Sequence, residues 1–315
     1  MNTIEASSLT KSYGERTAIS GLSLSVEEGD IFGFLGPNGA GKTTTIRIFT
    51  GLLEADSGEA RVAGIDVAKY PGAVKRAVGV LPESQGYYGW MTGKEYLSYF
   101  AELYGVPNAG RRAKELLKDV GLGDRGNSMI GGYSRGMRQR LGIARAMVHH
   151  PKVLFLDEPS LGLDPRGQRE INGLIRRLSR EEGVTVFLCS HLLSEIEDLC
   201  TRYAIVSEGS LIAEGDQSEL EARLGKKQRL KLEVSDPERS LDLARCINGI
   251  ESARLQGTLL LAEPKTGEVA ATLLRLLVGE DIRVYSMQRF TPSLEEIFLG
   301  LTEDHKDTHE LEVLR

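Results

Sequence analysis

The chain has 315 residues, and its 39 Lys and Arg against 45 Asp and Glu give a formal net charge of −6. At roughly 100–200 residues per domain this length predicts about two domains, and a composition of 41% hydrophobic and 27% charged residues excludes a disordered or fibrous chain. The acidic balance argues against nucleic acid as the partner.

The cysteines and the hydropathy of the chain indicate where such a protein works. Its three cysteines lie far apart without a CxxC pair, which argues against a disulfide framework and against a zinc site. The first 12 residues lack the apolar core of a signal peptide, and no run of 18 apolar residues occurs. We therefore expect a soluble, cytosolic protein.

The first predicted elements lead into a glycine-rich loop. Residues 22–26 alternate between apolar and polar side chains, which predicts a half-buried strand. Residues 31–35 form a short apolar run that is long enough for a buried strand, and the glycine-rich loop 36–41 follows it. Residues 43–51 are then predicted to form a helix.

The middle of the chain is predicted to be helical. Thr92 and Glu95 have the spacing of a capping box in front of an amphipathic segment. Residues 111–120 predict a second amphipathic helix. Ser134 stands where it would cap a third helix, which Pro151 brings to an end.

Further apolar runs complete the first part of the chain. Residues 153–156 and 184–188 predict two more buried strands, residues 167–182 predict a helix between them, and residues 203–213 predict a hairpin. Strands that are apolar on both faces and alternate with helices are typical of a parallel sheet covered on both sides. The expected fold class is therefore α/β.

The pattern changes after about residue 221. Residues 226–302 read as strand, helix, hairpin, helix and strand, followed by a last helix over residues 293–301. The order βαββαβ predicts a small α+β domain of the ferredoxin-like kind. We expect a large first domain at 1–220, an accessory domain at 226–302 and a charged tail at 303–315.

Residues 36–43 read Gly-Pro-Asn-Gly-Ala-Gly-Lys-Thr, which fits the phosphate-binding pattern G-x-x-x-x-G-K-[ST]. The glycines allow successive backbone N–H groups to turn toward an anion, and the following helix adds its positive end. Lys42 would reach the β- and γ-phosphates, and the Thr43 hydroxyl would bind Mg²⁺. A dinucleotide-binding loop is disfavoured, because Thr44 stands where that pattern needs a third glycine.

Polar residues follow two of the predicted strands. Asp157 and Glu158 end one strand and His191 follows the next, and ligands of open α/β sheets bind at such strand ends. Asp157 suits Mg²⁺, Glu158 would orient and deprotonate a water molecule, and His191 would bridge the γ-phosphate and Glu158. A solvated turn and a helix cap are the alternatives. We interpret His149 and His150 as charge partners of a helix C-terminus and not as metal ligands.

A second segment with a serine at a predicted helix start is more specific. Residues 133–137 read Tyr-Ser-Arg-Gly-Met, which resembles the Leu-Ser-Gly-Gly-Gln signature of the nucleotide-binding subunits of ABC transporters. Ser134 and Gly136 match this signature, whereas positions 133, 135 and 137 depart from it. The resemblance covers about residues 1–220. It implies a P-loop NTPase with a RecA-like parallel sheet core, an antiparallel β subdomain and a helical signature subdomain.

The resemblance also implies ATP and Mg²⁺ as ligands and assigns residues to them. Tyr13 matches the aromatic residue that stacks on adenine, and Asp164 lies in a loop that crosses a dimer interface. Glu83 replaces a glutamine that senses the metal and the membrane partner. The metal-binding residues are Thr43, Glu83 and Asp157, and the catalytic residues are Glu158 and His191. The nucleotide-binding residues are Tyr13, Gly36, Asn38, Gly39, Ala40, Gly41, Lys42, Thr43, Thr44, Ser134, Gly136 and Asp164.

Two more segments resemble one branch of that family. Leu-Pro-Glu at 81–83 and Ser-Leu-Glu-Glu-Ile-Phe-Leu at 293–299 are similar to ATPase subunits of ABC-2-type exporters with a C-terminal accessory domain. The resemblance implies a separate integral membrane permease and a position on the cytoplasmic face of the membrane. It also implies a head-to-tail dimer around two ATP molecules, either a homodimer or a heterodimer.

Two other functions stay open at this point. A soluble ABC-type ATPase that acts on ribosomes or DNA would use the same motifs. Three features of the sequence disfavour this alternative: the chain carries one set of ATPase motifs, the interval between Lys42 and Asp157 is short, and the net charge is negative. A small-molecule kinase would share the phosphate loop but has no use for a signature serine presented by a second subunit.

Overall fold

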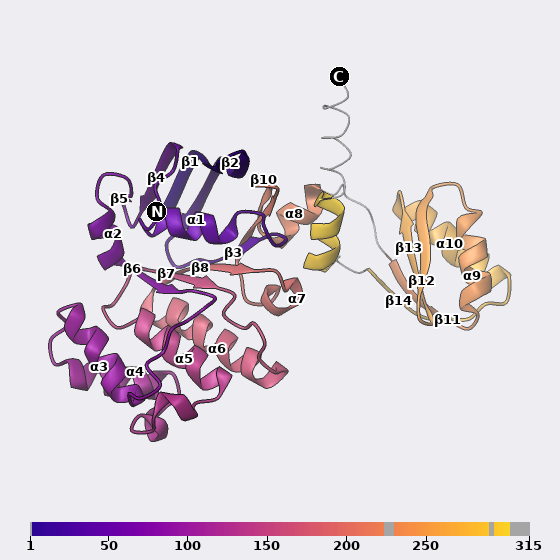
Figure 1. Cartoon of the computed structure of the whole chain (residues 1–315). Coiled ribbons are helices and arrows are strands. Elements are labelled where there is room, and N and C mark those ends of the chain that lie inside the picture. The colour runs from indigo at the N-terminus through magenta and orange to yellow at the C-terminus, as the bar shows by residue number, and fades with distance from the viewer. Residues whose placement is uncertain (1, 224–229, 290–292, 303–315) are drawn as a thin grey trace. The chain divides into compact units, whose positions relative to one another are not determined.

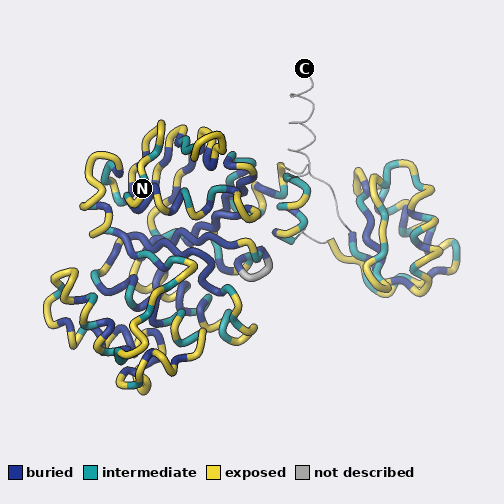
Figure 2. Tube along the Cα trace, in the orientation of Figure 1, coloured by how far each residue is buried: buried dark blue, intermediate teal, exposed yellow. Residues whose placement is uncertain are grey.

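The computed structural model describes residues 2–223, 230–289 and 293–302 (Figure 1). The chain divides into two compact units, Met1–Asp216 and Gln217–Arg315. Each unit contains buried segments of its own (Figure 2). No helix within the described ranges is long and apolar enough to cross a membrane.

The first unit is built on a six-stranded sheet. The strands lie in the order β10-β9-β3-β8-β7-β6, and every neighbouring pair is parallel except β9 and β10. Every residue of β3, β7 and β8 is buried, which explains their uninterrupted apolar runs. The predicted parallel α/β sheet is confirmed. The strands are β3 (Ile31–Leu35), β6 (Val78–Leu81), β7 (Val153–Asp157), β8 (Thr185–Ser190), β9 (Arg202–Ser207) and β10 (Ser210–Gly215).

An antiparallel sheet packs over the core sheet with one helix between them, as Figure 1 shows. Its order is β2-β1-β4-β5, and helix α1 (Lys42–Phe49) lies beneath it. Ile4, Val26 and Val62 of this sheet share one apolar core with Ile46 of the helix and Phe187 of β8. The strands are β1 (Asn2–Tyr13), β2 (Arg16–Glu27), β4 (Ser57–Val62) and β5 (Ile65–Asp66).

Side-chain caps fix where several helices of the first unit begin. The Thr92 hydroxyl accepts from the backbone N–H of Glu95, and the Glu95 carboxylate accepts from the backbone N–H of Thr92 at 2.8 Å, so the predicted capping box is confirmed. Ser134 caps the helix that begins at Arg135 by accepting from the backbone N–H of Met137 at 3.3 Å. The helices are α2 (Pro71–Ala77), α3 (Gly93–Leu103), α4 (Ala109–Asp119), α5 (Arg135–Ala146), α6 (Pro165–Glu182) and α7 (Leu193–Ile196).

The interpretation of His149 as a charged partner of a helix end is wrong. The ring stacks on Tyr104 with centroids 3.9 Å apart, and Nε2 lies 3.0 Å from the carbonyl oxygen of Val78. Burial lowers the pKa of His149, and the His150 and Arg112 charges lower it further. The imidazole therefore packs between Tyr104, which directly follows α3, and β6, and its burial favours the neutral form.

The second unit contains a four-stranded antiparallel sheet in the order β12-β13-β11-β14. Two helices pack on it, and the element order βαββαβ is the predicted one. The predicted junction at 226–227 and the tail at 303–315 lie outside the described residues. The elements are α8 (Gln217–Arg223), β11 (Leu230–Val234), α9 (Pro237–Arg245), β12 (Ile250–Gln256), β13 (Leu259–Pro264), α10 (Gly267–Gly279), β14 (Val284–Arg289) and a helix over residues 294–302.

Candidate active site

The glycine-rich loop joins the end of β3 to the start of α1, as its motif requires. Gly39 and Gly41 have φ angles of 87° and 98°, in the left-handed region that favours glycine. A Cβ atom at Gly41 would also strike the carbonyl oxygen of Ala18, and one at Gly36 would lie 2.5 Å from that of Val206. The loop can take this tight path only with glycine at these positions.

Lys42 is the first residue of α1, and its side chain is buried in the loop. The ammonium group donates to the carbonyl oxygens of Gly36 at 2.6 Å and Pro37 at 3.2 Å, while the residue is only 7% exposed. These acceptors carry no formal charge, and a buried cation is stabilised more strongly by an anion than by neutral groups. The position therefore suits a bound polyphosphate.

Thr43 and Asp157 bring a hydroxyl and a carboxylate together. The Thr43 hydroxyl donates to Oδ2 of Asp157 at 3.0 Å. Burial raises the pKa of Asp157, and the nearby charges of Glu158 and Glu83 add to this, while the Thr43 hydrogen bond and Lys42 oppose it. Hard oxygen ligands of this kind suit Mg²⁺.

Glu83 lines the same cavity as Thr43 and Asp157. Across the described ranges no group of three or more His, Cys, Asp or Glu side chains is placed to hold a metal ion by itself. Mg²⁺ is usually bound through one or two carboxylates together with substrate phosphates. The donor set therefore fits a metal that arrives with its nucleotide.

Glu158 and His191 form a close pair at the ends of β7 and β8. Nδ1 of His191 lies 2.8 Å from Oε1 of Glu158, and Glu158 is only 7% exposed. Glu158 has a φ of 52°, which is unusual for a residue with a side chain. Such strain is typical of functional sites, where the surrounding structure holds an unfavourable conformation in place.

A cavity of about 610 Å³ brings most of the predicted residues together. Its volume is within the usual range of roughly 300–1,000 Å³ for ligand sites. Tyr13 lines it and is 48% exposed, so this tyrosine is not a core residue. The other predicted lining residues are Asn38, Gly39, Gly41, Lys42, Thr43, Thr44, Glu83, Asp157, Glu158 and His191.

Some residues at or near this cavity were predicted and some were missed. Gly36 and Ala40 belong to the loop but do not line the cavity, and Ala40 is buried beneath it. Arg16 and Ala18 line it without belonging to any predicted motif, whereas Leu161 lines it from the loop before Asp164 that was predicted to cross a dimer interface. Arg16 directly follows the turn between β1 and β2, and no spacing rule connects it to the phosphate loop.

The signature residues lie outside this cavity. Ser134 and Gly136 are at the start of α5, and Asp164 caps α6 by accepting from Gly167 at 2.9 Å. The Arg135 guanidinium lies over Gly162. A Cβ atom added at Gly162 would lie 2.6 Å from Cζ of Arg135. Within one chain the signature therefore contacts the loop after Glu158 and not the phosphate loop.

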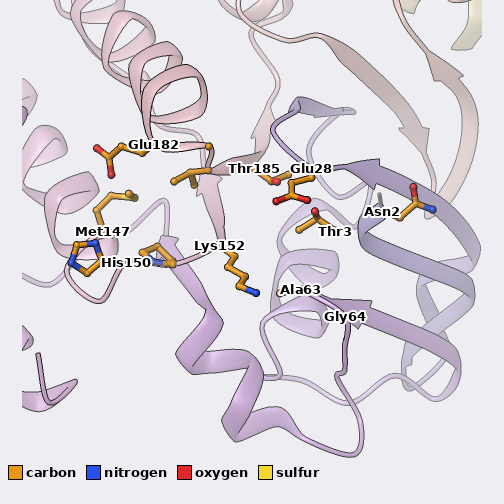
Figure 3. A pocket seen from close by; sticks show the side chains of 13 residues that line it. Asn2, Thr3, Glu28, Ala63, Gly64, Met147, His150, Lys152, Glu182 and Thr185 are labelled. Atoms are coloured by element: carbon orange, nitrogen blue, oxygen red, sulfur yellow. The ribbon is translucent and has the colours of Figure 1, made fainter.

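A second cavity, of about 510 Å³, lies at the amino ends of strands of the core sheet (Figure 3). Lys152 and Thr185 line it where β7 and β8 begin, and the Lys152 side chain extends toward the turn at Ala63 and Gly64. Ligands of α/β sheets bind at the carboxyl ends of strands. The cavity with the phosphate loop is therefore the candidate active site.

Curated relatives match this chain over nearly its whole length. The linearmycin resistance ATP-binding protein LnrL of Bacillus subtilis is 34% identical over 305 residues, which cover 95% of this chain and 98% of that protein. The bacitracin transport ATP-binding protein BcrA of Bacillus licheniformis is 36% identical, with 95% and 96% covered. The daunorubicin/doxorubicin resistance ATP-binding protein DrrA of Streptomyces peucetius is 38% identical, with 95% and 92% covered.

Solved structures agree with the fold of the first unit. An ATP-binding subunit of an ABC transporter matches with a TM-score of 0.64 and 29% identity, over 71% of this chain and 93% of that chain. An ATP-binding cassette of an ABC transporter in its ADP conformation matches with a TM-score of 0.63 and 27% identity, over 69% and 91%.

The parallel sheet, the phosphate loop and the carboxylates at the strand ends define a P-loop ATPase. The family model described as ABC transporter matches residues 19–161. The chain belongs to the ABC transporter family, and it is an ATP-binding and ATP-hydrolysing subunit of such a transporter. The predicted resemblance is confirmed, and the alternative of an ATPase that acts on ribosomes or DNA finds no support among these relatives.

Proposed function

We propose that this chain binds a separate integral membrane permease at the cytoplasmic face of the membrane and powers the export of an antibiotic-like compound. Its similarity to LnrL, BcrA and DrrA over 92–98% of their lengths carries this proposal. Two of these relatives are named for resistance and one for bacitracin transport. The common theme is removal of a toxic compound, so we assign that substrate class to this chain.

The nucleotide is proposed to lie along the cavity from Tyr13 to His191. Tyr13 would stack on the adenine ring with its exposed face. The N–H groups of the glycine loop and the ammonium group of Lys42 would bind the phosphates. Thr43, Asp157 and Glu83 would hold Mg²⁺, which neutralises charge on the phosphate oxygens when it is bound.

Hydrolysis is proposed to depend on the Glu158–His191 pair. The Glu158 carboxylate would accept a proton from the water molecule that attacks the γ-phosphate. His191 would hold Oε1 of Glu158, as the distance of 2.8 Å supports. Because Glu158 is buried, few water molecules can compete for its oxygens, and its orientation toward the phosphate is kept.

The signature residues are proposed to act across a dimer. Ser134, Gly136 and Asp164 lie away from the cavity of their own chain, so they would complete the cavity of a second subunit in a head-to-tail pair. The helix N-terminus behind Ser134 would then face the γ-phosphate bound by that subunit. The second subunit is either a copy of this chain or a sister ATPase. Residues 1–220 form the proposed ATPase domain, and residues 226–302 form an accessory domain.

The proposal is tested by expressing the chain together with the membrane protein that co-purifies with it in detergent. Cells that make the pair should tolerate higher concentrations of daunorubicin, bacitracin or linearmycin. The Lys42→Ala variant should remove this tolerance while it still assembles with the membrane protein. A chain that fractionates with ribosomes or DNA, and not with membranes, would overturn the proposal.

A further inference from the structure

Ser190 lies directly behind the proposed catalytic glutamate and belongs to none of the predicted motifs. It is the last residue of β8 and is only 1% exposed. Its hydroxyl oxygen lies 3.3 Å from Oε2 of Glu158 and 3.0 Å from the backbone nitrogen of Leu192. The side chain therefore contacts the one oxygen of Glu158 that His191 does not hold.

The direction of these hydrogen bonds follows from the donors available. A serine hydroxyl offers one proton and two lone pairs. The N–H of Leu192 can only donate, so it occupies a lone pair of Ser190. The hydroxyl proton is then directed to the Glu158 carboxylate, and hydrogen bonds to a charged acceptor are the stronger kind.

Glu158 is thus held at three points. Its backbone N–H donates to the carbonyl oxygen of Cys189 at 2.9 Å, its Oε1 is held by His191, and its Oε2 is held by Ser190. Two of these partners are adjacent residues of β8 and the third directly follows that strand. One strand end therefore fixes both the strained backbone of Glu158 and the rotation of its carboxylate plane.

We propose that Ser190 is a positioning residue for ATP hydrolysis, which holds Oε2 of Glu158 so that the carboxylate faces the attacking water molecule. The proposal rests on the role of Glu158 as proton acceptor. Ser190 lies behind Glu158 and does not line the nucleotide cavity. Its removal therefore affects the turnover step and not the affinity for ATP.

The test compares steady-state ATP hydrolysis by the purified full chain and its variants. Ser190→Ala should lower kcat about tenfold or more, since it removes a hydrogen bond to a charged group, and should leave KM for ATP nearly unchanged. Ser190→Thr keeps the hydroxyl and should restore most of kcat. The matched control is Ser179→Ala, which removes a buried serine hydrogen bond to Gly29 at 2.9 Å far from Glu158.

A second measurement covers the case in which Ser190→Ala simply loosens the fold. Thermal unfolding is compared for Ser190→Ala, Glu158→Ala and the double variant. If Ser190 contacts the Glu158 side chain, Ser190→Ala lowers Tm by less in the Glu158→Ala background than in the parent chain. Additive Tm losses, an unchanged kcat, or a kcat loss that Ser190→Thr fails to restore would each overturn the proposal.

These outcomes are separate from those that test Glu158 itself. If Glu158→Gln retained the parent rate of hydrolysis, the proposed role of Glu158 would fail. The unfolding cycle would still report whether Ser190 holds its carboxylate. If Glu158→Gln abolished hydrolysis but Ser190→Ala did not slow it, only the positioning role of Ser190 would be lost.

Discussion

The hydroxyl of Thr43 donates a hydrogen bond of 3.0 Å to Oδ2 of Asp157, although 114 residues separate them in the chain. This contact joins the first turn of α1 to the carboxyl end of β7. It keeps a neutral and a charged oxygen ligand adjacent before any metal arrives. Two of the proposed Mg²⁺ ligands are therefore adjacent without a bound metal, and single substitutions can test whether they hold one.

Thr43→Ala should raise the Mg²⁺ concentration needed for half-maximal ATP hydrolysis by about tenfold, because the variant lacks the proposed hydroxyl ligand and the hydrogen bond to Asp157. Thr43→Ser keeps the hydroxyl and should behave like the parent chain. The measurement is the hydrolysis rate against Mg²⁺ at a fixed ATP concentration. An identical Mg²⁺ dependence for the Thr43→Ala variant and the parent would remove Thr43 from the metal site.

Glu158→Gln should lower kcat by about 100-fold or more, because the amide cannot accept the proton of the attacking water molecule. ATP binding should persist, since the phosphate loop is unchanged. Sedimentation in the presence of ATP should show the variant as a stable dimer while the parent chain returns to monomer as ATP is consumed. Turnover by the variant at a rate near that of the parent would exclude Glu158 as the base.

Ser134→Ala should weaken ATP-dependent dimerisation without weakening the binding of ATP to a single chain. It also removes a helix cap, which costs about 1 kcal/mol of stability. Thr92→Ala is the matched control because it removes the cap of α3, at a similar cost and away from the nucleotide cavity. If both variants dimerised equally well in sedimentation experiments, Ser134 would have no role across the interface.

Gly142→Ala should destabilise the first unit by about 1–3 kcal/mol, as overpacking does. A Cβ atom there would lie 2.5 Å from Cδ1 of Leu81 and 2.8 Å from the Tyr87 hydroxyl. Gly173 is the control, because it lies in the interior of α6 with nothing within 4 Å of an added Cβ atom. Gly173→Ala should stabilise the chain by about 0.5–1 kcal/mol in chemical unfolding. Equal effects of the two substitutions would contradict the packing of Gly142.

The lowered pKa of His149 predicts a loss of stability in acid. Burial favours the neutral ring, so the unfolded chain binds a proton at a higher pH than the folded chain does. The contribution of His149 to the free energy of unfolding is therefore fully present above the pKa of about 6.5 in the unfolded chain, and it is lost as the pH falls below that value. His149→Phe keeps a ring for Tyr104 and should flatten the dependence of Tm on pH between about 5 and 7. An unchanged slope would assign the acid sensitivity to other groups.

Short-range patterns in the sequence were sufficient to predict much of the fold. The buried strands β3, β7 and β8 were predicted because burial on both faces leaves an uninterrupted apolar run. Thr92 and Ser134 were predicted as caps because a cap depends only on residues within one turn. The phosphate loop was predicted for the same reason.

Strands whose pattern is irregular were missed. β1 has register shifts between Ala6 and Leu9, so its apolar residues do not keep a period of two. β5 has only two residues, Ile65 and Asp66, which is too short for any periodicity. Some contacts between distant segments were missed as well, although those of Thr43 with Asp157 and of Glu158 with His191 agree with the predicted roles. Arg16 reaches the site through the pairing of strands, which no spacing along the chain encodes. Ser190 was missed although it directly precedes the predicted site residue His191 at the end of β8.

The positive φ of Glu158 also bears on how the activity of a sister subunit can be inferred from its sequence. A residue with a side chain is unfavourable in this conformation, whereas glycine or asparagine adopts it readily. The proposed role of the carboxylate in hydrolysis would explain why glutamate stands here. A sister subunit that does not hydrolyse ATP would not require this carboxylate. The backbone conformation would then favour glycine or asparagine at the matching position. The residue after the strand-end aspartate is therefore an indicator, readable from sequence alone, of whether a partner subunit still hydrolyses ATP.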